Sequence, residues 1–235
     1  MLTCSASSVL RRVLLPALVL LHLAPAWAAR PASRPVMLKL TLHIRMAMCD
    51  GKPVQPTAWV DGHVAAANRI LTPHGIKLVA LQNTFTPKRC ELVTRAHRDV
   101  LAAYAPLGQV NVLVVRRAQD LDTPTYDLMG VHWRAPTGAL HAALQNGSPP
   151  RRAGGTRWVI LTARARPPVL AHELCHYLGL RHDPAGGNLM TPGPSDPSWS
   201  GPGRKPAPWK PLLTRSQALR VRAAVSRLIR SGVAR

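Results

Sequence analysis

The chain has 235 residues, with 31 lysines and arginines against 10 aspartates and glutamates, giving a net charge of +21 at pH 7. This length suits one domain with a hydrophobic core and is short for two. No zinc-finger, helix-turn-helix or aromatic-studded RNA-binding motif is present. A chain this basic is expected to adhere to polyanions. A general arginine bias with solvated charge is the alternative, and we favour it because the arginines are spread along the sequence.

The N-terminus has the pattern of a secretory signal peptide. Arg11 and Arg12 precede an apolar run, Val13–Leu23, and small residues follow up to Ala28. We therefore predict cleavage after about Ala28 and a secreted or periplasmic protein. The run is shorter than the roughly 20 residues of a membrane-spanning helix, so we expect no span in the mature chain, 29–235. An uncleaved membrane anchor is the alternative.

Hydrophobic periodicity then predicts alternating strands and helices. The predicted strands are Val36–Met48, Ile76–Phe85, Gln109–Arg116, Met129–Trp133 and Trp158–Ala163. The predicted helices among them are Thr57–Leu71 and Cys90–Tyr104. Glycine, proline and serine enrichment marks Asn146–Thr156 and Ser195–Pro211 as loops.

The sequence HELCHYLGLRHD follows the last strand and carries the chemistry. His172 and His176 are four residues apart, so they lie on one face of a helix and suit one zinc ion. Glu173 lies between them and reaches a water on the metal without being a ligand. Gly179 suits a turn with positive φ that ends the helix and returns His182 as third ligand. Three ligands leave one position open for water, as in catalytic zinc sites.

A capping box opens the last predicted helix. Thr214 is followed three residues later by Gln217. The apolar residues on one face of this helix are Ala218, Val221, Val225 and Leu228. We expect it to pack on the domain; the alternative is a free basic amphipathic helix on membranes.

Three cysteines remain after the predicted cleavage. Cys49 ends the first strand and Cys90 precedes a predicted helix, so in an exported protein we expect these two to form a disulfide. Cys175 is left over on the histidine-bearing helix. We interpret it as a small buried hydrophobe; the alternative is a thiolate that competes for zinc.

The stretch HELCHYLGLRHD followed by NLM resembles the metzincin metallopeptidases, whose pattern is HExxHxxGxxH and then a methionine in a tight turn under the zinc. Asp183 is similar to the adamalysin (reprolysin) branch, whereas Cys175 stands where that branch usually has glycine. The resemblance implies one Zn²⁺ per chain and assigns Met190 to the turn. A buried core methionine is the alternative for Met190.

The resemblance also implies a fold and a substrate surface. The fold is α+β (mixed α/β), with a five-stranded twisted mixed sheet and an active-site helix in 36–182 and a small C-terminal subdomain ending in a helix in 183–235. The fourth strand is the antiparallel edge to which extended substrate adds; here its residues are Met129, Gly130, Val131, His132 and Trp133. A core strand is the alternative. The wall of the S1′ pocket falls at Thr191 and Pro192.

These observations predict a secreted zinc metalloendopeptidase in which Glu173 is the general base. We expect a monomer that acts on protein or peptide substrates. Two alternatives remain, a non-catalytic zinc-binding secreted protein and a basic adhesion protein whose main partner is a polyanion.

Overall fold

The computed structural model describes residues 36–135, 157–192 and 210–233. The strands are β1 (Leu38–Cys49), β2 (Lys52–Pro53), β3 (Ile76–Phe85), β4 (Glu91–Leu92), β5 (Val110–Val115), β6 (Arg117–Ala118), β7 (Gly130–Arg134) and β8 (Arg157–Thr162). The helices are α1 (Thr57–Leu71), α2 (Arg95–Asp99), α4 (Pro168–Tyr177) and α5 (Arg215–Arg230), with the 3-10 turns η1 (Thr72–His74) and η2 (Val100–Tyr104). The predicted signal peptide, the Asn146–Thr156 loop and nearly all of the Ser195–Pro211 loop lie outside the described residues.

The main sheet is mixed, and its strands lie in the order β3–β1–β5–β8–β7, with the short β2 also paired to β1. β1, β3, β5 and β8 run parallel to one another. β7 runs antiparallel to β8 and stands at the end of the sheet. The mixed α/β class with a mixed sheet, expected from the sequence, is confirmed by this architecture.

The strand patterns follow from where each strand lies in the sheet. β5 is central and buried throughout, so it reads as a nearly continuous apolar run. β1 alternates instead: Leu40, Leu42 and Ile44 are buried, while the residues between them are partly exposed. This period of two places one face of β1 in the core and leaves the other closer to water.

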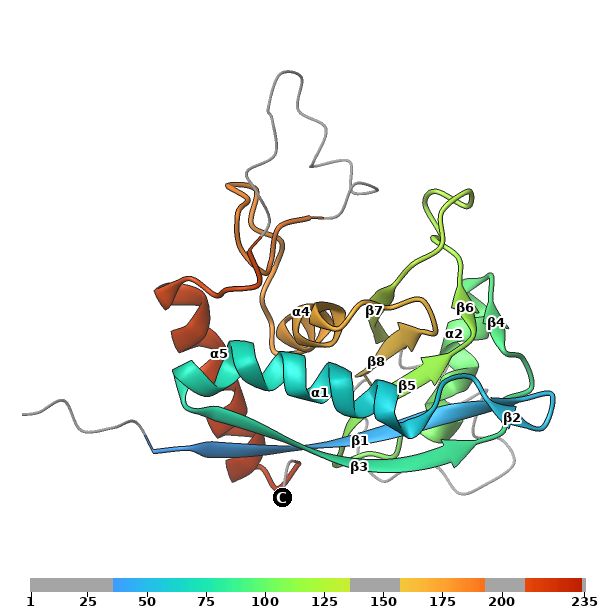
Figure 1. The fold of residues 1–235 in the computed structure, drawn as a ribbon, viewed down its shortest axis with the longest axis horizontal. Coiled ribbons are helices and arrows are strands. Elements are labelled where there is room, and N and C mark those ends of the chain that lie inside the picture. The colour runs from blue at the N-terminus through green and yellow to red at the C-terminus, as the bar shows by residue number, and fades with distance from the viewer. Residues whose placement is uncertain (1–35, 136–156, 193–209, 234–235) are drawn as a thin grey trace, which may run out of the picture. The chain divides into compact units, whose positions relative to one another are not determined.

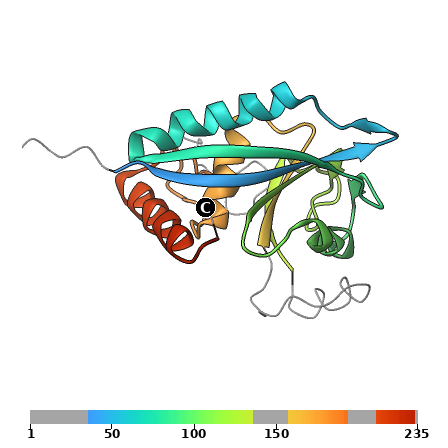
Figure 2. The same ribbon diagram turned by 90° about the horizontal axis from the view of Figure 1, so that it is seen from below.

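Two hydrophobic clusters line the two faces of the sheet. The first cluster joins the buried faces of α1, α4 and α5 to one face of β1, β3, β5 and β8. The second cluster lies under η2 and includes the large side chains of Trp133 and Trp158. Figure 2 shows α1 on one side of β1 and β3 and α2 on the other.

The prediction of a single helix over Cys90–Tyr104 was wrong. Glu91 and Leu92 form β4, which pairs in parallel with β6. Helix α2 begins only after Thr94, whose side chain accepts a hydrogen bond from the His97 backbone at 3.2 Å. The helical turns then tighten into η2, so a strand pairing made with a distant segment overrides the local helical pattern.

α5 begins at the capping box expected from the sequence. The Thr214 side chain accepts from the Gln217 backbone, and the Gln217 side chain accepts from the Thr214 backbone at 2.9 Å. Val221 and Val225 are fully buried in the first cluster. The apolar face of α5 is thus covered by the domain, which contradicts the free membrane-surface helix. Among the described residues, no helix is both long and apolar enough to cross a bilayer.

Candidate metal centre

Helix α4 lies beside β7 and β8 (Figure 1), and the first two histidines of the motif are part of this helix. His172 and His176 are one helical turn apart. The helix closes with two backbone hydrogen bonds, from Gly179 to His176 at 3.0 Å and from Leu180 to Cys175 at 2.9 Å. Gly179 has φ +97°, a conformation that costs glycine little and other residues more. The predicted glycine turn therefore ends this helix.

The turn brings His182 back to the two helical histidines. Their ligand nitrogens all lie within 4.8 Å of one another, and the Nε2 atoms of His172 and His176 are 3.0 Å apart. Zinc–nitrogen bonds of about 2.0–2.1 Å require nitrogens roughly 3.3 Å apart in a tetrahedral site. The three imidazoles therefore fit a zinc ion with little rearrangement.

Two backbone carbonyls fix the orientation of the helical imidazoles. Nδ1 of His172 lies 2.7 Å from the Leu189 carbonyl, and Nδ1 of His176 lies 2.8 Å from the Leu180 carbonyl. A carbonyl can only accept, so each Nδ1 carries the proton and each Nε2 keeps its lone pair for a metal.

Burial keeps these rings neutral. It lowers the pKa of His172, and together with the neighbouring charge of His172 it lowers the pKa of His176 to about 4. Neutral imidazole is the form that binds metals, so no proton has to be released from these rings at neutral pH.

Glu173 lies beside the histidines in a water-poor environment. Burial raises the pKa of its carboxyl to about 8, and a hydrogen bond from the backbone N–H of His132 in β7 opposes that rise. The approach of β7 is close. A Cβ on Gly130 would lie 2.8 Å from Cγ of Glu173 and 2.7 Å from a methyl group of Val169. Only glycine at this position lets β7 and α4 pack around the carboxylate.

A polar network connects the third histidine to the methionine turn. The Asp183 backbone donates to the Met190 carbonyl at 2.8 Å. The Asp183 carboxylate accepts from Asn188 at 2.7 Å and from Gln217 of α5 at 3.1 Å. Met190 is fully buried, and its backbone N–H donates to the Asn188 side chain at 2.8 Å. The network holds the segment after His182 against α5.

Sequence reasoning missed most of this network. It used Asp183 only as a subfamily marker and Gln217 only as a capping residue. The capping pattern predicts the hydrogen bonds between Gln217 and Thr214. It does not predict that the Gln217 side-chain amide also donates to Asp183, which is 34 residues away in the sequence. Asn188 carried no sequence signal.

The segment predicted to bind substrate, Met129–Trp133, corresponds to the antiparallel end strand β7 with a shift of one residue. Its side chains alternate. Gly130 faces α4, and the His132 ring lies 5.9 Å from that of Tyr177 in α4. Val131 and Trp133 pack in the second cluster, where Trp133 donates to Asp99 at 2.8 Å. The structure thus brings two of the five residues, Gly130 and His132, to the side of α4, and only His132 does so with a side chain.

The charges around His132 are all positive apart from Glu173. Burial, and then the nearby guanidinium groups of Arg157 and Arg134, lower the pKa of His132 to about 4. Its Nε2 is buried and has no hydrogen-bond partner among the described residues.

Thr191 and Pro192, predicted to line the S1′ pocket, are both buried directly after Met190. The Thr191 hydroxyl accepts a hydrogen bond from the Asn188 backbone at 3.0 Å. In this structure the Thr191 side chain is therefore part of the turn.

The cysteines are placed on opposite sides of the sheet. Cys49 and Cys90 form a disulfide with a Cα–Cα distance of 6.0 Å in the second cluster. Cys175 is free and fully buried in the first cluster. Burial, and then the charge of Glu173, raise the pKa of its thiol to about 12. Among the described residues, the side chains that converge as possible metal ligands are His172, His176 and His182, and Cys175 is not one of them.

No protein-family model and no curated protein sequence matches the chain. Among solved structures, it is similar to mature mirolysin of Tannerella forsythia in complex with a cleaved peptide, with 10% identity and a TM-score of 0.42 over 63% of this chain and 66% of that one. It is also similar to metalloproteinase-II of Bacteroides fragilis, with 18% identity and a TM-score of 0.46 over 83% of this chain and 55% of that one. This chain thus spans about two thirds and about half of those two chains.

Proposed function

We propose that this protein is a zinc-dependent endopeptidase of the metzincin type. The observation that carries the proposal is the convergence of three imidazoles with a buried carboxylate at their side. The two helical histidines have their Nδ1 protons directed at carbonyls, so their Nε2 lone pairs are available in the same small volume. A carboxylate in that volume that is not a metal ligand is the requirement for metal-assisted hydrolysis.

The histidines and Glu173 have different roles in the proposed reaction. A zinc ion held by His172, His176 and His182 would lower the pKa of a bound water to about 7 and polarise the substrate carbonyl. Glu173 accepts a proton from the attacking water and then delivers it to the leaving amine. Burial raises the pKa of Glu173 to about 8 without metal, and the positive charge of a bound zinc ion would lower it, so that the carboxylate can accept a proton near neutral pH.

The surroundings of Glu173 position it for these transfers. The backbone N–H of His132 fixes the carboxylate, and the absence of a side chain on Gly130 leaves room for it. The Asp183–Asn188–Gln217 network keeps the segment after the third histidine in place. We expect changes in this network to weaken metal binding first and catalysis as a consequence.

The experiment compares residues 29–235 with the Glu173→Ala variant on casein and on an internally quenched peptide, with and without a zinc chelator. We expect hydrolysis by the zinc-loaded wild type, and a loss of about 100-fold or more in the variant, which keeps its zinc. Metal content measured by mass spectrometry is the control. Hydrolysis by Glu173→Ala at the wild-type rate would refute the proposal, and zinc bound without turnover would favour the non-catalytic alternative.

One observation favours a second candidate function, binding of polyanions. The solvent face of α5 carries four exposed arginines and α5 contains no aspartate or glutamate; these arginines are Arg215, Arg220, Arg227 and Arg230. Such a face attracts a polyanion in a salt-dependent way. The test is retention on heparin with zinc removed. Replacement of these four arginines by glutamine should move elution to lower salt, whereas unchanged elution would exclude α5 as the surface.

A further inference from the structure

The inference concerns substrate preference and rests on the proposed peptidase function. It begins with β7, which pairs only with β8 among the described residues and so has one open edge. The Met129 carbonyl accepts from Thr162 at 3.0 Å on the β8 side, so His132, three residues further on, turns its backbone N–H to the open edge, near Glu173. Backbone groups of alternate residues point to the same side of a strand, so Gly130 and Arg134 direct their N–H and C=O groups to the same edge. An extended peptide added there lies alongside the metal centre.

The far end of this edge carries two positive charges side by side. Arg134 of β7 and Arg157 of β8 are direct cross-strand partners. Like charges at directly opposite positions destabilise a strand pair. No carboxylate lies within ion-pair distance of either guanidinium in the described part of the chain, where the ion pairs all involve Arg116, Arg117 or Arg164.

Neighbouring side chains hold this charge pair next to the metal centre. The Arg157 guanidinium lies over the ring of Tyr177, 4.3 Å from its centroid, in a cation–π contact. Tyr177 directly follows His176 in α4. Arg157 is thereby held in place, while Arg134 is exposed and free to meet a ligand.

We propose that Arg134 and Arg157 form a subsite for an acidic side chain of the substrate. If the scissile carbonyl lies beside Glu173 at the level of His132, then Arg134 is two residues further along β7. Antiparallel strand pairs are the commoner and slightly more stable kind. Antiparallel addition with the residue of the scissile carbonyl opposite His132 places the third residue on the N-terminal side of the scissile bond opposite Arg134. An aspartate or glutamate there relieves the repulsion between the two arginines.

The test uses one internally quenched peptide with a cleavage site mapped by mass spectrometry, made with Glu, Gln or Lys at the third position before the cleaved bond. We expect the zinc-loaded wild type to cleave the Glu peptide with a kcat/KM about tenfold above that for Gln, as one charge-assisted contact provides, and to cleave the Lys peptide least. Arg134→Glu should reverse the order of the Glu and Lys peptides. Arg134 is exposed, so the fold should tolerate this change.

Arg95→Gln is the matched control. Arg95 is also exposed beside β7, but its guanidinium lies over Trp133 on the opposite face of the strand. This variant should keep the preference of the wild type. Equal kcat/KM for all three peptides, a preference unchanged in Arg134→Glu, or an acidic preference on the C-terminal side of the bond would each overturn the proposal.

A binding measurement separates this proposal from the peptidase function. The zinc-loaded Glu173→Ala variant should bind the Glu peptide about tenfold more tightly than the Gln peptide by fluorescence anisotropy, since the contact needs no turnover. Absence of any cleavage by the wild type would count against the proposed function alone. Equal affinity of both peptides for Glu173→Ala would count against the acidic subsite.

Discussion

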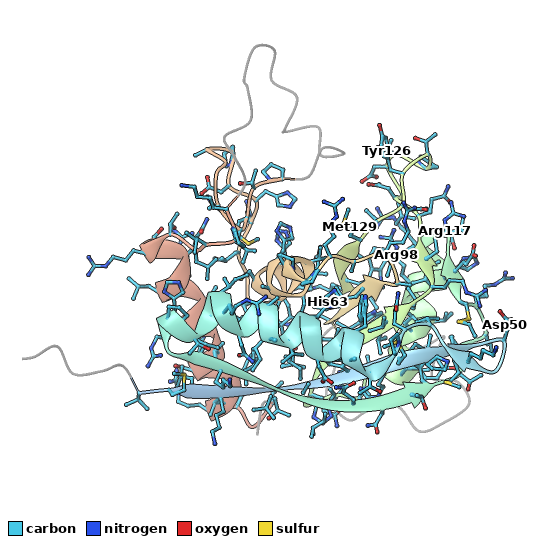
Figure 3. All side chains as sticks on the ribbon, viewed as in Figure 1. Asp50, His63, Arg98, Arg117, Tyr126 and Met129 are labelled. Atoms are coloured by element: carbon cyan, nitrogen blue, oxygen red, sulfur yellow. A yellow bond between two sulfur atoms is a disulfide. The ribbon has the colours of Figure 1, made fainter. Side chains whose placement is uncertain are left out.

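The two faces of the sheet are stabilised in different ways. On the face that carries the metal centre, α1, α4 and α5 supply long apolar surfaces, and four of the eight buried polar side chains of the described residues, Glu173, Asn188, Thr191 and Gln217, lie around the histidines and the methionine turn. The other face has only the short α2 and η2 and is closed by the Cys49–Cys90 disulfide. Ion pairs lie at this end, where Figure 3 shows Asp50 and Arg117 far from α5.

The difference indicates that function and stability are carried by separable parts of the molecule. On the first face, packed helices fix side chains whose arrangement serves a metal. On the second face, a covalent bond replaces helical packing that the sequence does not supply. Changes on one face should therefore affect metal binding with little effect on stability, and changes on the other face should do the reverse.

The largest expected effect is that of removing a ligand. His182→Ala should weaken zinc binding by more than about 100-fold, because changes in groups that merely support a ligand already cost 10- to 100-fold. The measurement is competition with a fluorescent zinc chelator. His97→Ala, a histidine of α2 on the second face, is the control and should bind zinc like the wild type. Equal zinc affinity of the two variants would remove His182 from the ligand set.

The disulfide should show the opposite behaviour. Cys49→Ser with Cys90→Ser is expected to lower the free energy of unfolding by about 2–4 kcal/mol, because the unfolded chain gains freedom across 41 residues. The measurement is urea denaturation with zinc removed. Zinc affinity of the folded variant should stay within about twofold of the wild type. A large loss of zinc affinity would show that the two faces are coupled.

Gly130 tests the close approach of β7 to α4. Gly130→Ala is expected to cost about 1–3 kcal/mol of stability through overpacking against Glu173 and Val169, and to reduce turnover as the carboxylate is displaced. Gly62→Ala is the matched control. Gly62 lies in α1 with open space where a Cβ would be, so this change should stabilise the protein by about 0.5–1 kcal/mol. Normal turnover by Gly130→Ala would mean that β7 can shift without consequence.

The smallest expected effect is on the pH dependence of the metal-free protein. The pKa of Glu173 is about 8 when folded against 4.5 as a free group, so the folded chain retains a proton that the unfolded chain has lost. Stability should therefore fall by about 1–2 kcal/mol as pH rises from 6.5 to 8, since one pKa unit corresponds to about 1.4 kcal/mol. The lowered histidine pKa values act in the opposite direction near pH 6.5, where the unfolded histidines are still half protonated, so the Glu173 contribution is the difference between the wild type and Glu173→Gln. Urea denaturation with chelator should show this slope in the wild type and not in Glu173→Gln.

Local patterns in the sequence were sufficient for much of the fold. α1 begins and ends where its apolar spacing predicted, and α5 begins at its capping box. The segment Cys90–Tyr104 failed because its first residues pair with β6, a choice that local periodicity does not contain. The one-residue shift at β7 has the same origin, because the register is set by β8.

The sequence alone determined the spacing of His172 and His176, the turn at Gly179 and the carboxylate beside them, because a helix fixes the relation of residues three or four apart. Only the tertiary structure decided what surrounds them. The contact of Gly130 with Glu173, the link from Asp183 to Gln217 and the adjacency of Arg134 and Arg157 join residues more than 20 positions apart. Such contacts depend on how strands and helices pack together, which is set by the whole core rather than by any local pattern.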